Sequence, residues 1–318
     1  MRHLRSGARV ALLGVATVSI SVTASAQTLP TVQERLGYPR EARLLVIHVD
    51  DVGMAHSVNR ATFAAFRNGW VTSASILVPC PWFPEVAAFA KANPEADFGI
   101  HLALNSEWTT FRWAPVLGPD AVPSLLDDQG YFPLVQPPVA ARAKLDEVER
   151  ELRAQIQRAW SAGIRISHLD THMITLTITP GLFKVYQRLG RELGLPILQE
   201  RRLAESLKVE IPADEVLIDQ VVAIDENVEP AEWRNTYQKL LAPLRPGVHE
   251  LIVHLAHDDD EMRGATADHP DYGAAWRQND FDLVGSDQFR QFLKDQGFVL
   301  VTWKDLTRAL PKDYRDRR

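Results

Sequence analysis

Cysteine is almost absent from this sequence. The chain of 318 residues contains one, Cys80, and a single thiol can form neither an intramolecular disulfide nor a cysteine-rich zinc site. Basic charge is also scarce, because 35 Lys and Arg stand against 41 Asp and Glu, for a net charge of −6. Proteins that coat nucleic acid normally carry a basic face, so we expect no nucleic-acid partner. Any bound metal ion must have histidine and carboxylate ligands.

Long apolar runs are scarce as well, and the one at the amino terminus has the pattern of a secretory signal peptide. Three arginines precede the uncharged, mostly apolar stretch 10–22, and Ala24-Ser25-Ala26 supplies the small side chains that signal peptidase accepts. A membrane anchor would need about 20 apolar residues, so this stretch is short for a span. We expect residues 1–26 to be a signal peptide, no membrane span in the rest, and a secreted or periplasmic protein with a single domain over residues 27–318.

Beyond the signal peptide, strands and helices are predicted to alternate. Residues 43–50 form a nearly continuous apolar run, as in a parallel strand buried on both faces. Residues 140–162 have apolar side chains at helical spacing. Further strands are predicted at 71–78, 98–104, 164–169, 216–222, 250–254 and 299–302, and further helices at 57–69, 84–92 and 182–193. This alternation is typical of an α/β protein with a parallel sheet, either open or closed into a barrel.

Two long segments, 105–138 and 257–284, do not follow this pattern. The first contains six of the 20 prolines and several aromatic residues, and the second is polar and acidic. Loops of this length are usually functional or disordered, and aromatic content favours function. Both segments follow predicted strands, so we expect them at the carboxyl edge of the sheet, where parallel α/β proteins build their sites.

Acidic and imidazole side chains also gather at the ends of the predicted strands. They are Asp50, Asp51, His101, His168, Asp170, His172 and His254. Each alone has an ordinary explanation, since an Asp pair is often a turn or helix cap and a lone histidine in a strand is usually a core residue. Together at one edge they suit metal-assisted hydrolysis of an amide or ester. One Asp and two His can hold a divalent ion, a second carboxylate can take a proton from water, and another histidine can protonate a leaving group.

The motifs that carry these residues resemble those of a known family. They are Asp50-Asp51-Val52-Gly53 with Asn59 and the stretch 68–73, Gly99-Ile100-His101-Leu102, His168-Leu169-Asp170-Thr171-His172, and Glu250 with His254. In this order, between residue 43 and about residue 305, they resemble the YdjC-like carbohydrate deacetylases, also called the ChbG/HpnK family.

The resemblance implies a distorted (β/α) barrel of parallel strands, like that of polysaccharide deacetylases. It also implies removal of N-acetyl groups from an amino sugar or oligosaccharide, a small carbohydrate substrate. By the family pattern Asp51, His101 and His172 hold one divalent metal ion, Zn²⁺ or Mg²⁺. In the same pattern Asp50 is the base and His254 the acid.

The sequence departs from the family pattern at two positions and leaves several questions open. Ile174 stands where many members have a third histidine, and Val52 replaces the usual aromatic residue, so we expect an atypical substrate pocket. The spacing of His168 and His172 allows either to be the ligand, with His172 our assignment and His168 supporting the site. The sequence also allows a homodimer.

Three tryptophans are candidate substrate-binding residues. Trp108, Trp113 and Trp276 are candidate platforms for sugar rings, although ordinary packing explains them equally well.

Two other functions are alternatives to a deacetylase. A glycoside hydrolase could use the carboxylates of Asp50 and Asp170, but this hypothesis leaves the histidines without a role. A non-catalytic envelope protein that binds sugar or metal is the other alternative.

Overall fold

The computed structural model describes residues 30–316 with the exceptions of 213 and 226, so the predicted signal peptide lies outside the described residues. The strands are β1 (Arg43–Val52), β2 (Ser73–Ile76), β3 (Phe98–Leu102), β4 (Ile166–Thr171), β5 (Gln220–Val222), β6 (Gly247–Val253) and β7 (Phe298–Leu300). The helices are α1 (Val32–Arg35), α2 (His56–Arg67), α3 (Phe83–Ala92), α4 (Gln136–Arg142), α5 (Leu145–Ser161), α6 (Pro180–Leu193), α7 (Arg201–Leu207), α8 (Trp233–Leu241), α9 (Asp260–Ala265), α10 (Ala274–Gly285), α11 (Asp287–Asp295), α12 (Trp303–Thr307) and α13 (Lys312–Arg315).

All strand pairs in the described sheet are parallel, in the order β4-β3-β2-β1-β6-β5, with β7 also beside β1. The strand β1 is central because β6 pairs with it along Arg43–Val49, while β7 pairs with Arg43–Leu45 and β2 pairs with His48–Val52. Consecutive parallel strands require crossover connections, and the helices between them provide these connections.

Two short bridges close this sheet into an irregular ring. Leu169 of β4 pairs with Ile197, and Glu200 pairs with Ile218 just before β5. The backbone amide of Leu198 donates to the Leu169 carbonyl at 2.9 Å, so residues 197–200 occupy the place of a strand between β4 and β5. The expected α/β fold with a distorted parallel barrel is therefore confirmed.

The interior of the ring changes from apolar to polar along β1. Alternate side chains of a strand point to opposite faces. Leu44 and Val46 belong to an apolar cluster with Val216, Ile218, Val248 and Trp303. The next residues on this face are His48 and Asp50. His48 contacts side chains of β2, β4 and β6, and side chains of strands so far apart meet only inside the ring.

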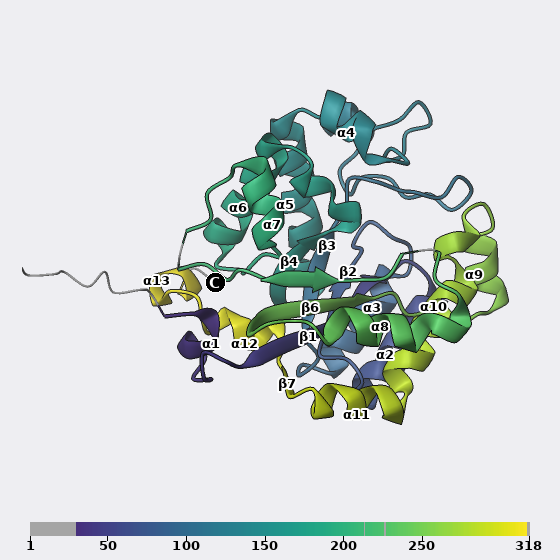
Figure 1. Cartoon of the computed structure of the whole chain (residues 1–318). Coiled ribbons are helices and arrows are strands. Elements are labelled where there is room, and N and C mark those ends of the chain that lie inside the picture. Colours follow the sequence, from purple (N-terminus) through teal and green to yellow (C-terminus); the bar gives the residue numbers. More distant parts are fainter. Residues whose placement is uncertain (1–29, 213, 226, 317–318) are drawn as a thin grey trace, which may run out of the picture.

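Helices surround the ring and leave the carboxyl ends of the strands to the connecting segments (Figure 1). The helices α5 and α6 pack against each other near β3 and β4, and α2 and α10 lie on the other side. Near the amino ends of the strands lie α1, α12 and α13. The segment that contains α4 and the helices α9 and α10 flank the opposite end.

One prediction about the long segments was wrong. Residues 257–284 were expected to lack regular structure, but they contain α9 and most of α10. The buried residues of α10 mix apolar side chains with Arg277 and Asp280, so the helix has no clean apolar stripe that a sequence pattern could reveal. Residues 105–138 consist mostly of turns and short helical pieces, as expected.

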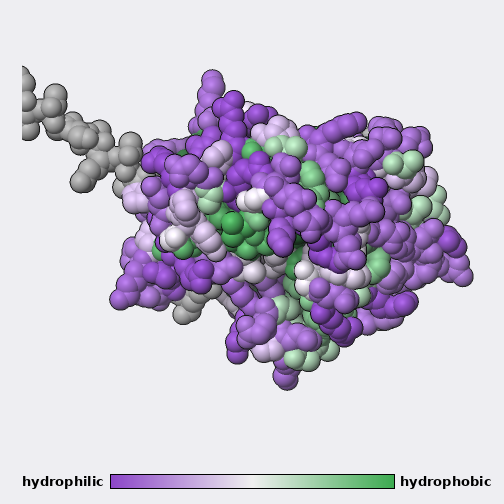
Figure 2. All heavy atoms as spheres, turned by 60° about the horizontal axis from the view of Figure 1, so that its bottom comes forward, coloured by the Kyte–Doolittle hydropathy of each residue, from purple (hydrophilic) through white to green (hydrophobic). Residues whose placement is uncertain are grey.

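The surface is dominated by hydrophilic side chains. Figure 2 shows one face on which hydrophobic areas are small and separated by polar residues. Among the described residues, no helix combines the length and the apolar character needed to cross a membrane.

Candidate active site

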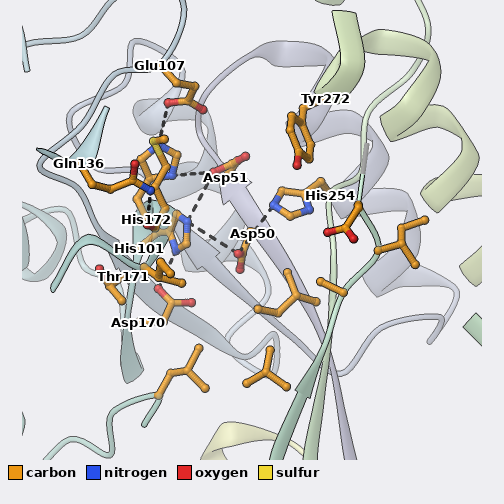
Figure 3. Close-up of a pocket in the computed structure, with 18 of the residues that line it drawn as sticks. Asp50, Asp51, His101, Glu107, Gln136, Asp170, Thr171, His172, His254 and Tyr272 are labelled. Carbon is orange, nitrogen blue, oxygen red and sulfur yellow. Dashed lines mark hydrogen bonds and ion pairs between the residues drawn. The ribbon is translucent and has the colours of Figure 1, made fainter. Parts of the chain in front are cut away.

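A cavity of about 620 Å³ opens at the carboxyl ends of the strands. Seven of the predicted site residues line it: Asp50, Asp51, His101, Trp108, His172, His254 and Trp276. Figure 3 shows the two aspartates and the three histidines turned toward one another. Trp113 is not among the described lining residues, and its ring packs behind His172 with the ring centroids 5.7 Å apart.

The local backbone explains how two consecutive aspartates face one cavity. In a regular strand their side chains would point to opposite faces. The β1–β2 register shifts between Val49 and Val52, and Asp51 has a left-handed φ of 65°. Aspartate tolerates this conformation better than most residues. Asp50 and Asp51 therefore both reach the cavity, and Gly53, with a φ of 99°, continues the turn.

The side chains of Asp51, His101 and His172 converge on a small volume. Asp51 Oδ1 lies 3.5 Å from His101 Nε2 and 3.3 Å from His172 Nδ1. The ligand atoms of all three residues lie within 4.8 Å of one another, and each residue is buried. Asp51 Oδ1 is itself buried without a hydrogen-bond partner. A buried carboxylate oxygen without a donor is costly, so the set fits a divalent ion that would bind all three atoms.

In both His101 and His172, the ring nitrogen that does not face Asp51 contacts another carboxylate. Asp170 Oδ1 lies 2.8 Å from His101 Nδ1, and Glu107 Oε2 lies 2.8 Å from His172 Nε2. Metal-ligating histidines usually donate their second ring N–H to such a partner, which fixes the tautomer and the ring orientation. Burial lowers the pKa of His172, but Glu107 and Asp51 outweigh it and raise that pKa to about 10. Both imidazoles thus present their remaining nitrogen to Asp51.

Arg277 holds the other oxygen of Asp51. Its Nη2 donates to Asp51 Oδ2 at 2.8 Å, and both side chains are almost fully buried. Burial alone would raise the pKa of Asp51, but Arg277 and then His172 hold it well below its usual range. The guanidinium also lies 5.6 Å from the centroid of the Trp108 ring, within cation–π range. The Asp51 carboxylate is therefore fixed so that Oδ1 faces the histidines.

His254 lies on the other side of Asp50. Its Nε2 is 3.8 Å from Asp50 Oδ2, and Figure 3 shows the pair side by side. The backbone amide of His254 donates to Asp280 Oδ2 at 2.8 Å, and the Trp233 indole and Tyr237 hydroxyl donate to Asp280 Oδ1. Burial lowers the pKa of His254. The arrangement places an imidazole and a carboxylate together beside the Asp51 cluster.

The structure brings His172, rather than His168, to Asp51 and His101. His168 lies in the interior of the ring, stacked on Trp303 with the ring centroids 4.7 Å apart, and its Nδ1 is 2.8 Å from Ser167 Oγ. Two other groups also lie close enough to share an ion, namely His48 with His168 and Asp170, and Asp50 with His101 and Asp170. In both of these groups Asp170 is already hydrogen-bonded to His101.

Ile174 lies at the cavity wall with 60% of its side chain exposed. Both Met173 and Ile174 have left-handed backbone conformations, with φ values of 51° and 53°. A β-branched residue is strained in this conformation. The position at which the resemblance led us to expect a third histidine therefore carries an exposed aliphatic side chain on a strained turn.

Sequence reasoning missed Glu107, Arg277 and Asp280. Glu107 lies in an irregular segment and the other two lie in α10, where no strand end or motif marks them. The only available signal was the position of Glu107 and Arg277 in the two long segments that were expected to border the site.

The chain is similar to known proteins along most of its length. The model of the YdjC-like protein family matches residues 44–295. A carbohydrate deacetylase of Thermus thermophilus is 32% identical over 285 residues, which cover 87% of this chain and 98% of the relative. A carbohydrate deacetylase of Thermoanaerobacter pseudethanolicus is 24% identical, with 83% and 99% covered.

A solved structure shows the same fold. It is described as a putative cellobiose-phosphate cleavage protein of Enterococcus faecalis, and it superimposes with a TM-score of 0.69 at 22% identity, covering 84% of this chain and 99% of that one. The family match spans most of the chain and includes the strands that carry the site residues. The chain therefore belongs to the YdjC-like protein family.

Proposed function

We propose that this protein is a metal-dependent hydrolase that removes N-acetyl groups from a small carbohydrate. The observation that carries the proposal is the buried cluster of Asp51, His101 and His172 with Asp50 and His254 beside it. The names of the carbohydrate deacetylases that align over most of the chain support the substrate class.

The metal ligands in this proposal are Asp51, His101 and His172. Two imidazoles and one carboxylate are a donor set that favours Zn²⁺, since Mg²⁺ prefers oxygen ligands. When bound, a divalent ion supplies Lewis-acid polarisation of a carbonyl and lowers the pKa of water. Glu107 and Asp170 orient the two imidazoles, and Arg277 orients the carboxylate.

The remaining residues move the protons of the reaction. Hydrolysis adds the oxygen of water to the acetyl carbon and breaks the bond from that carbon to the sugar nitrogen. In this proposal Asp50 accepts a proton from the attacking water and the neighbouring His254 delivers a proton to the departing amine, which is supported by their position beside the Asp51 cluster. Trp108 and Trp276 border the cavity but are buried, and their contact with a sugar ring stays a prediction.

The test is acetate release from a panel of N-acetylated mono- and oligosaccharides, with and without a chelator. The proposal requires acetate release that the chelator abolishes and that divalent ions restore. A glycoside hydrolase would cleave glycosidic bonds without acetate release and would keep its activity in chelator. A non-catalytic protein would bind sugar and release nothing.

We also propose that the chain is exported after removal of residues 1–26, on the basis of its amino-terminal sequence pattern. Amino-terminal sequencing of the protein from its native host tests this, and an intact Met1 on a cytoplasmic product would contradict it. The homodimer stays a prediction.

A further inference from the structure

One buried histidine inside the ring has no role in the proposed reaction. His48 lies on β1 two residues before Asp50, and its side chain is fully buried. It lies below the cavity, among side chains that come from β1, β2, β4 and β6. Its ring faces three carboxyl groups, those of Asp50, Asp170 and Glu250.

The two ring nitrogens of His48 contact different acids. Nε2 lies 3.0 Å from Asp170 Oδ2 and 3.3 Å from Asp50 Oδ1. Nδ1 lies 3.4 Å from Glu250 Oε1. Burial lowers the pKa of His48, but Glu250, Asp170 and Asp50 outweigh it and raise that pKa well above its usual value. With a proton on each nitrogen the ring forms ion pairs with the acids on both sides, while its hydrogen bond joins Nε2 to Ser75 Oγ at 3.1 Å, and Nδ1 and Asp170 Oδ2 have no hydrogen-bond partner among the described residues.

These contacts connect the proposed base Asp50 with Asp170, which contacts the proposed metal ligand His101. Asp170 uses Oδ2 for His48 and Oδ1 for His101, at 3.0 and 2.8 Å. Asp50 uses Oδ1 for His48, while its Oδ2 faces His254. The Ser75 hydroxyl lies 3.1 Å from both the His48 ring and His101 Nδ1. The imidazole of His48 thus faces both Asp50 and Asp170, as His101 also does, with its Nε2 3.8 Å from Asp50 Oδ2.

We propose that His48 is a positioning residue that fixes the base Asp50 relative to Asp170, and through Asp170 orients the ligand His101. The inference rests on the proposed function. Two buried carboxylates with no cation between them repel each other and seek other partners. A misplacement of a catalytic group by about 1 Å can lower a rate by about 10². We therefore expect the loss of His48 to lower kcat, although His48 does not touch the substrate.

The experiment is a double-mutant cycle with His48→Leu and Asp50→Asn, measured as kcat and KM for acetate release. We expect His48→Leu to lower kcat by about 10² with KM changed by less than about threefold. In the Asp50→Asn background, at saturating Zn²⁺, the same change should lower kcat by less than about threefold, because the base on which His48 acts is already lost and the metal site stays occupied. His48→Gln keeps an amide donor and should recover at least about tenfold of the lost kcat.

The affinity for Zn²⁺ provides a readout that does not depend on activity. Since Asp170 supports His101, His48→Leu should weaken Zn²⁺ binding by about 10-fold or more in calorimetry. His249→Leu is the matched control. His249 is also a buried histidine, on the neighbouring strand β6, but its Nε2 contacts the Arg245 carbonyl, and we expect kcat and Zn²⁺ affinity near those of the wild type.

Three results would overturn the inference while the proposed function stands. They are an unchanged kcat in a folded His48→Leu protein, losses that multiply in the double mutant, and a His48→Gln protein that folds but is as impaired as His48→Leu. If His48→Leu does not fold, His48→Gln alone decides, since a positioning role requires it to keep at least about a tenth of the wild-type kcat and to bind Zn²⁺. If the wild-type protein releases no acetate from any sugar, the proposed function itself fails.

Discussion

Replacing Arg277 by methionine tests how much the buried partner of Asp51 contributes. Methionine keeps an unbranched apolar side chain but is shorter and removes the donor that lies 2.8 Å from Asp51 Oδ2. Both side chains are about 3% exposed, so the variant leaves a buried carboxylate without its cation. Breaking such a pair typically costs about 3–5 kcal/mol. With an unfolding entropy of about 2.1 cal/mol/K per residue, that corresponds to a fall of roughly 4–8 °C in Tm for a chain of 318 residues.

The control is Arg150→Met, which removes an ion pair of the same length. Arg150 lies 2.8 Å from Asp146, but these side chains are 49% and 69% exposed, so we expect little change. Unfolding in urea is measured for the metal-free proteins, because a bound ion would partly compensate Asp51. With saturating Zn²⁺ the deficit of Arg277→Met should shrink. If Arg277→Met and Arg150→Met are equally stable without metal, burial does not decide the strength of these pairs and the reasoning fails.

Three further predictions concern the two aspartates, one ligand and one buried acid. Asp51→Asn should lose both the bound ion and acetate release, whereas the kcat of Asp50→Asn should fall by about 10²–10⁴ while the ion stays bound. The metal content of each purified variant is the measurement. If Asp50→Asn were metal-free and Asp51→Asn metal-loaded, the roles of the two aspartates would have to be exchanged. Metal binding at pH 7 should release a proton, because the pKa of His172 is raised to about 10 in the metal-free protein and its ligating nitrogen must be deprotonated. Calorimetry in buffers of different ionisation enthalpy measures this release, and its absence would contradict the prediction. Burial raises the pKa of Asp280 from 3.8 to about 6, so its protonated form stabilises the fold fully below pH 3.8 and this contribution, roughly 3 kcal/mol, is lost as the pH rises through 6. Urea unfolding of the wild type relative to Asp280→Asn between pH 4 and pH 7 measures the loss, and a constant difference would refute it.

The sequence predicts the part of the site that depends on strand ends. Asp50, Asp51, His101 and His254 follow apolar runs, and in a parallel sheet all carboxyl ends lie at one edge. This rule is enough to bring them together without knowledge of the contacts. The choice between His168 and His172 needs the structure, because it depends on where β4 ends and on which side of the ring each side chain points.

The side chains that support the site could not be predicted in the same way. Glu107 reaches His172 from an irregular segment, and Arg277 reaches Asp51 from a helix that is 226 residues away in the chain. Their positions depend on how these segments fold back over the strand ends, which no local pattern encodes. Trp113 was predicted as a platform for sugar rings together with Trp108, which lies in the same segment. Unlike Trp108, it is not among the described residues that line the cavity.

The left-handed backbone of Asp51 also limits which amino acids can replace it in a mutant library. The φ of 65° admits glycine, asparagine and aspartate at low conformational cost and disfavours longer or β-branched side chains. Ion pairing with Arg277, by contrast, accepts only a carboxylate. The two requirements overlap at aspartate alone. In saturation mutagenesis, asparagine and glycine should therefore dominate among folded but inactive variants, and glutamate should be lost because of its backbone preference rather than its charge.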